Sequence, residues 1–189
     1  MAHTIVGVFD AYSEAGKAVD KLVNGGISRD AITVHTTEDD LSIADEARAQ
    51  NVDVPLPTTE FTGSRGALKV LERIERFFDG VFRDDDKPED TEHYLEAARR
   101  GCTVITVNVD DDAHVQTICR TLWEAGAVDL EERVSHWRTT GYTGFRRGAP
   151  VYTQEEAEAE RRVFLSRRGT AKPEFKQDRV RAYPRRALE

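Results

Sequence analysis

The sequence predicts an α+β protein with a ferredoxin-like plait, in which βαβ occurs twice and a four-stranded antiparallel sheet carries both helices on one face. Apolar residues with the i, i+3, i+4, i+7 and i+8 spacing of a core-packed helix occur twice, about one hundred positions apart. The two copies consist of Ala15, Ala18, Val19, Leu22 and Val23, and of Val115, Ile118, Cys119, Leu122 and Trp123. Gly26 and Gly126 suit the ends of these helices.

Each predicted helix lies between two strand-like runs. Residues 4–9 and 103–109 precede the helices and are nearly continuous apolar runs, which is typical of central strands. Residues 31–35 and 128–134 follow the helices and mix polar with apolar side chains, as half-exposed edge strands do. We therefore predict that the first and third strands are central and antiparallel, with the second and fourth strands at the edges.

A helical insertion over residues 38–101 separates the two repeats within a domain predicted over residues 1–136. A short helix is expected over residues 42–49 and another over residues 89–100. Residues 67–82 place many apolar side chains mainly on one side of a helix, which requires a partner surface. These side chains are Leu68, Leu71, Ile74, Phe77, Phe78, Val81 and Phe82. We expect this helix to cover the open face of the sheet or to join a neighbouring subunit.

The chain ends in two further segments. Residues 137–169 comprise an aromatic stretch and a C-terminal helix, whose start is indicated by the capping-box spacing of Thr153 and Glu156. The apolar stripe of this helix is thin, so we expect it to lie on a neighbouring subunit or to fray. Residues 170–189 combine prolines with many charges and predict an extended charged tail outside the fold.

Composition and charge limit the classes of function. Among 189 residues, 39% are hydrophobic and 33% are charged, and the apolar runs are too short for a transmembrane helix. No export signal precedes the first strand, so we predict a cytoplasmic protein that does not enter a membrane. The net charge of -8 divides into -11 for residues 1–150 and +3 for residues 151–189. This asymmetry can favour self-association or an acidic partner, although a charged tail is more often simply solvated.

Catalytic and metal-binding spacings are absent from the sequence. The five histidines lie far apart, and no nucleophile elbow, phosphate-binding lysine loop or dinucleotide fingerprint occurs. Residues 110–112 are three aspartates at a helix start, where we expect caps, and Cys102 and Cys119 fit small buried hydrophobes. We predict no catalytic residue, metal or cofactor. An enzyme site assembled in space, for example from His93 and Asp110, is a third hypothesis.

One short segment suits an anion. Ser64, Arg65 and Gly66 combine a hydroxyl, a guanidinium and a glycine at a predicted helix start, a set that favours phosphate, although a simple turn capped by Ser64 is the more common explanation of such a segment. Specific nucleic-acid binding is not expected, because residues 102–109 offer no aromatic side chain for base stacking and the body of the protein is acidic.

Three segments occur in an order typical of a known family. They are residues 4–10 with the helix that follows, residues 93–107, and residues 137–145 with the proline, threonine and glutamate after them. Together they resemble the bacterial general stress protein 17M-like family, also called the heat-induced stress protein domain. The resemblance implies a ferredoxin-like domain in a cytoplasmic protein associated with stress, and it implies no reaction or cofactor. The helical, acidic insertion and Arg146–Arg147 depart from the family pattern.

Two functional hypotheses stand ahead of the enzyme hypothesis. The first is a non-catalytic, stress-associated module that acts through self-assembly and through binding of a protein partner or a small ligand. It predicts a homodimer whose candidate interface anchors are Phe77, Phe78, Trp137 and Tyr142. The alternative is a regulator that binds a nucleotide or phosphorylated metabolite as effector, with the insertion as its sensing element.

Overall fold

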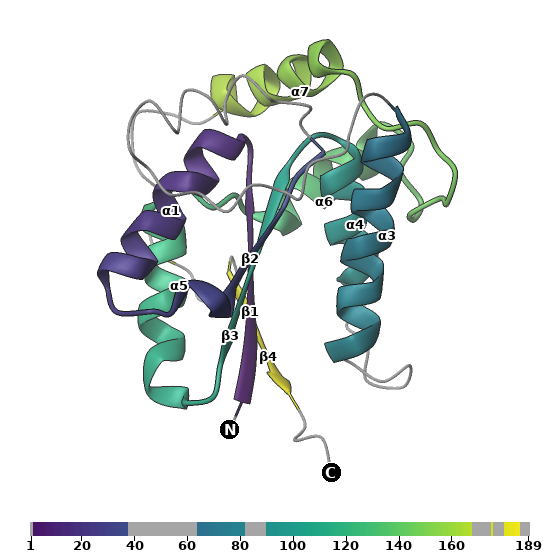
Figure 1. Cartoon of the computed structure of the whole chain (residues 1–189). Coiled ribbons are helices and arrows are strands. Elements are labelled where there is room, and N and C mark those ends of the chain that lie inside the picture. Colours follow the sequence, from purple (N-terminus) through teal and green to yellow (C-terminus); the bar gives the residue numbers. More distant parts are fainter. Residues whose placement is uncertain (1, 38–63, 82–89, 168–174, 176–179, 186–189) are drawn as a thin grey trace.

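A four-stranded antiparallel sheet lies at the centre of the molecule, with helices on both faces (Figure 1). The computed structural model describes residues 2–37, 64–81, 90–167, 175 and 180–185. The strands are β1 (Ala2–Phe9), β2 (Ile32–His35), β3 (Thr103–Val109) and β4 (Arg181–Arg185), in the order β2-β3-β1-β4. The central positions of β1 and β3 and the edge position of β2 are confirmed. The short helix expected over residues 42–49 lies outside the described residues.

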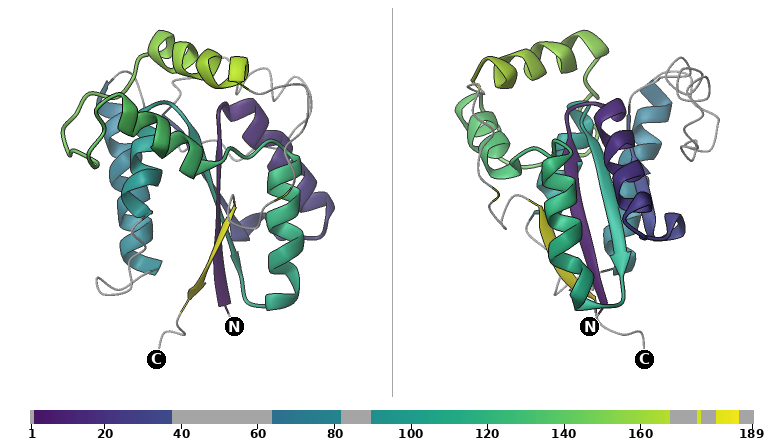
Figure 2. Two further views of the ribbon diagram at one scale, coloured as in Figure 1. Left: turned by 180° about the vertical axis from the view of Figure 1, so that it is seen from behind. Right: turned by 90° about the vertical axis from the view of Figure 1, so that its left-hand side faces the viewer.

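The two repeat helices cover one face of this sheet, as predicted. They are α1 (Tyr12–Asn24) and α5 (Val115–Glu124), which lie together on the same side in both views of Figure 2. Their apolar stripes pack against alternate side chains of β1 and β3 in one buried cluster. Its helical members include Ala15, Ala18, Leu22, Ile118 and Leu122. Short 3-10 turns at Arg29–Ala31 and Asp112–His114 lead into β2 and α5.

The opposite face is covered within the same chain by α3 (Ser64–Val81), α4 (Thr91–Arg99) and α6 (Leu130–Thr139). Here α3 buries Ile74 and Phe78 in a core cluster that it shares with α4 and the sheet, and the rings of Phe78 and Tyr94 stack with centroids 5.4 Å apart. The helix predicted over residues 67–82 therefore forms an intramolecular cover. None of the helices in the described ranges is long and apolar enough to cross a membrane.

The predicted fourth strand was wrong. Residues 128–134 lead into helix α6, because Asp129 accepts hydrogen bonds from the amides of Glu131 and Glu132 and thereby caps a helix start. The fourth strand is instead β4, which comes from the segment predicted as a tail outside the fold. It pairs with β1 from Arg181 opposite Val6 to Arg185 opposite Ala2. The second repeat is thus not a continuous βαβ unit.

Helix α7 (Gln154–Arg167) was predicted from its capping box, and the structure contains it. The Thr153 amide donates to Glu156 Oε2 at 2.8 Å, and the Glu156 amide donates back to Thr153 Oγ1 at 3.3 Å. The helix crosses one end of the molecule near α6 (Figure 1) and buries only Ala157 and Phe164.

Candidate functional site

A cluster of charged and phenolic side chains fastens β4 to the body of the protein. Asp90, at the start of α4, accepts hydrogen bonds from Arg181 and from the Tyr183 hydroxyl, the latter at 2.8 Å. Arg181 also donates to Glu131 of α6 at 2.6 Å, and the hydroxyls of Tyr94 and Tyr183 lie 2.8 Å apart. We call these five residues the Asp90 cluster. It connects α4, α6 and β4.

The electrostatics of the Asp90 cluster fix its protonation at neutral pH. Burial raises the pKa of Asp90, but the neighbouring His93, the hydrogen bond from Tyr183 and the charge of Arg181 outweigh it and lower the pKa to about 2. Burial raises the pKa of both Tyr94 and Tyr183 above the usual phenolic range. The carboxylate therefore stays ionised while both phenols stay protonated, so neither phenol is suited to act as a base or nucleophile at neutral pH.

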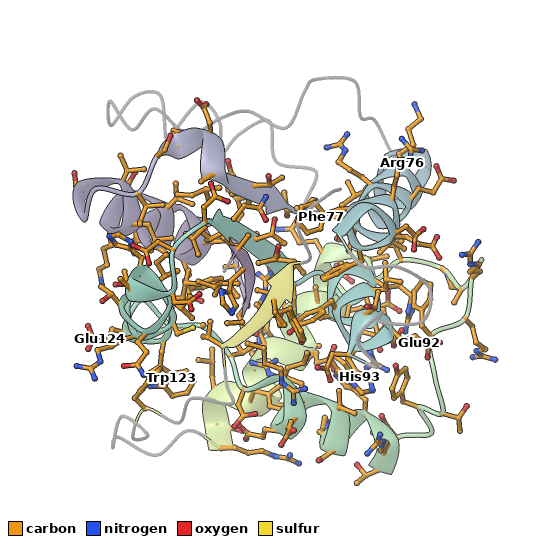
Figure 3. The ribbon with its side chains drawn as sticks, turned by 90° about the horizontal axis from the view of Figure 1, so that it is seen from below. Arg76, Phe77, Glu92, His93, Trp123 and Glu124 are labelled. Atoms are coloured by element: carbon orange, nitrogen blue, oxygen red, sulfur yellow. The ribbon has the colours of Figure 1, made fainter. Side chains whose placement is uncertain are left out.

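A pocket of about 510 Å³ lies beside this cluster. Four members of the Asp90 cluster line it together with four apolar residues. The cluster members are Asp90, Glu131, Arg181 and Tyr183, and the apolar residues are Val115, Cys119, Val180 and Ala182. Figure 3 shows β4 between α5, which carries Trp123 and Glu124, and α4, which carries Glu92 and His93. Two carboxylates face one guanidinium in the lining, so this charge balance favours a neutral or cationic group over an anion.

The thiol of Cys119 contributes an apolar wall to the pocket. Burial raises the pKa of Cys119 to about 11 and that of Cys102 to about 12. Both thiols are therefore protonated at neutral pH, and both cysteines are buried and free of disulfides. This agrees with their predicted character as small hydrophobes.

A second polar network attaches α7 to α4 and α6. Glu96, which is 2% exposed, accepts hydrogen bonds from Arg99 and Arg100. Arg100 also donates to Glu160 of α7 at 3.0 Å, and Trp137 Nε1 donates to the same carboxylate oxygen at 2.6 Å. Because the donors and acceptors of this network satisfy one another, its role is to hold α7 in place.

The predicted interface anchors pack within the chain. Phe78 and Trp137 are fully buried, and Phe77 and Tyr142 are partly buried against the same core. Neither Phe78 nor Trp137 has surface to offer a partner in this conformation. The aromatic character of these four residues therefore serves the attachment of α3 and of the segment after α6.

The other predicted site residues are dispersed. Ser64, Arg65 and Gly66 form the first turn of α3, and their side chains lie outside the described part of the chain. Asp111 accepts from the Ala113 amide at 2.9 Å, which confirms its predicted role as a cap. His93 has Asp90 as its carboxylate neighbour, with Nδ1 3.7 Å from Oδ1. Within the described ranges, no three potential metal ligands come together.

Sequence reasoning missed the Asp90 cluster, because its members lie far apart in the chain. One weak signal marks β4: Val180 and Ala182 alternate with Arg181 and Tyr183, as on the two faces of a strand. The run is short and is followed by Pro184, a residue that suits an edge strand but also suits a tail.

Comparisons with protein-family models, with curated proteins and with solved structures found no match to this chain. The resemblance to the general stress protein 17M-like family therefore stays a prediction from the sequence motifs.

Proposed function

We propose that this chain is a non-catalytic, cytoplasmic, stress-associated module of bacteria, which works through self-assembly and through binding of a protein partner or a small ligand. The observation that supports ligand binding is the pocket beside β4, where the Asp90 cluster meets an apolar wall. Pockets with a few fixed polar groups on an apolar lining are the usual form of small-ligand sites.

The ligand group that fits this pocket best is an amine or guanidinium. Arg181 is already paired with Asp90 and Glu131, which leaves a carboxylate in excess. The side chain of Glu131 is 70% exposed, so an incoming cation can reach it without disturbing the core. We assign the apolar part of the ligand to the wall formed by Val115, Cys119 and Val180.

The proposed core is a ferredoxin-like plait that takes its fourth strand from the C-terminal segment. This arrangement gives β4 two roles, because the strand closes one edge of the sheet and also lines the pocket. A ligand in the pocket would then stabilise the attachment of β4.

Thermal melting of the full chain with spermidine tests the binding proposal. A ligand that binds only the folded state raises the free energy of unfolding, by about 2.7 kcal/mol at a ligand concentration of 100 times its Kd, and so raises the melting temperature. For a chain of this size that corresponds to roughly 5–10 °C. We expect spermidine to raise the melting temperature of the parent and of Glu132→Gln, and to raise that of Glu131→Gln much less.

Glu132→Gln is the matched control, because Glu132 is exposed in the same first turn of α6 but does not line the pocket. Equal shifts for both variants, or no shift for the parent, would contradict the proposed pocket. If ATP instead raises the melting temperature and Arg65→Ala abolishes that rise, the result supports the effector-binding alternative.

A further inference from the structure

Helix α7 has an outward face that the described part of the chain leaves uncovered. Val163, which is 38% exposed, lies about 40° from the exposed Ala159 on this face, whereas Leu165, which is 58% exposed, lies on the flank of the helix. The inward face is held by Ala157 and Phe164, and Figure 2 shows the helix at the margin of the molecule in both views. Ala159 and Val163 therefore give this face a small apolar strip between charged side chains, which permits the close approach of a second helix.

Charge along this helix is divided between its two halves. Three glutamates that are not part of the Glu96 network, Glu155, Glu156 and Glu158, lie in the N-terminal half. The C-terminal half carries Arg162, whose side chain is 77% exposed, and Arg167. A second copy of the same helix in antiparallel orientation brings acidic halves beside basic halves, whereas a parallel copy brings like charges together.

We propose that α7 pairs antiparallel with α7 of a second copy of this chain, around a two-fold axis near Ala159. This inference rests on the self-assembly in the proposed function and names its surface. At 100° per residue, Ala159 lies on the side opposite the buried Ala157 and Phe164, and its small side chain permits close approach. Arg162, which pairs with Glu158 of its own helix, then faces the acidic half of the other copy near Glu155, and the pairing is self-complementary, as a two-fold contact must be.

The size of the surface predicts a weak dimer. A helix of 14 residues is about 21 Å long, so a single helix pair buries less than the roughly 800 Å² per partner of a standard interface. We therefore expect a dimer that depends on protein concentration.

Disulfide trapping of the full chain tests the orientation. The two native cysteines are buried, so a cysteine introduced on the outward face of α7 is the accessible one. In the antiparallel pair, Ala159→Cys places the two thiols at the axis. Ser166→Cys, seven residues further along the same face, places them about 21 Å apart, beyond the Cα separation of about 7 Å that a disulfide allows.

At several hundred micromolar under mild oxidation, we expect Ala159→Cys to form a covalent dimer at least ten times faster than Ser166→Cys. Equal rates, or faster trapping of Ser166→Cys, would overturn the antiparallel pairing. A dimer in light scattering without trapping of Ala159→Cys would overturn this surface and leave the proposed self-assembly standing. A monomer in light scattering at the same concentration, again without trapping, would refute both.

Discussion

His35 is a buried titratable side chain without hydrogen-bond support in the described part of the chain. It lies on β2, is 2% exposed and packs against the Phe77 ring of α3, with ring centroids 5.7 Å apart. Among the described residues, neither ring nitrogen has a hydrogen-bond partner. Burial, with a smaller contribution from the charge of Arg73, lowers the pKa of His35 to about 4. The imidazole is therefore neutral in the folded protein near pH 7.

This lowered pKa predicts a loss of stability in mild acid. Between the unfolded pKa of about 6.5 and the folded pKa of about 4, the unfolded chain binds a proton that the folded chain excludes, so stability falls as the pH falls. By this linkage, His35 accounts for about 2.5 kcal/mol of loss between pH 7 and pH 4.5. We expect that His35→Phe loses about 2.5 kcal/mol less stability than the parent between pH 7 and pH 4.5. Urea unfolding at both pH values measures the two losses.

His114→Asn is the control for this experiment, because the side chain of His114 is 59% exposed. It should leave the pH dependence of the parent unchanged. If His35→Phe loses as much stability on acidification as the parent does, His35 is not the group responsible.

At the residue scale, the sequence predicts burial well and polar contacts poorly. The period of the repeat helices identifies Ala15 and Leu122 as buried, because burial follows from position on a helix face. The pairing of Asp90 with Arg181 joins residues 91 positions apart, and it depends on the tertiary arrangement of α4 and β4. No local pattern records such a pairing.

At the scale of single elements, α7 packs directly against the backbone at Gly101. Gly101 has a φ of +88°, and a Cβ placed there would lie 2.6 Å from the Cβ of Ala157. The Gly101 carbonyl also accepts a hydrogen bond from Arg161 at 3.2 Å. A side chain at this position would therefore strain the backbone and would also overlap with Ala157 of α7.

Gly101→Ala should destabilise the protein more than Gly126→Ala, which provides a matched control. Gly126 has a φ of +111° but no neighbour within 4 Å of an added Cβ. Backbone strain alone costs about 1–2 kcal/mol, and the overlap with Ala157 adds about 1–3 kcal/mol. Urea unfolding measures both free energies. Equal losses would show that α7 moves away from Gly101 without cost.

The segment after α5 shows why an element can be assigned to the wrong class. Val128, Leu130 and Val134 suit an edge strand by composition, and a short apolar run does not distinguish a strand from a helix. In the structure this segment forms helix α6. Asp129 caps its start, and Leu130, Val134 and Trp137 lie buried along one face of the helix. The edge beside β1 is then left for β4.

At the scale of the whole molecule, the sheet is completed by a segment remote from the repeats. The sequence predicts the two central strands and both repeat helices, because each has a strong local period. It does not predict the partner of the free edge of β1, since that choice depends on which segment reaches it. Val180, which is 1% exposed, and the Asp90 cluster show how firmly the C-terminal segment is built into the fold.

Hydrogen exchange of β1 in two shortened chains tests this account most directly. A chain that ends at residue 185 keeps β4, and a chain that ends at residue 179 lacks it. Within residues 2–6, every second amide points toward β4 and the others point toward β3. We predict that the amides that point toward β4 exchange in the first chain as in the full protein and at least about ten-fold faster in the second. Identical exchange of residues 2–6 in both chains would contradict the assignment of the C-terminal segment as the fourth strand.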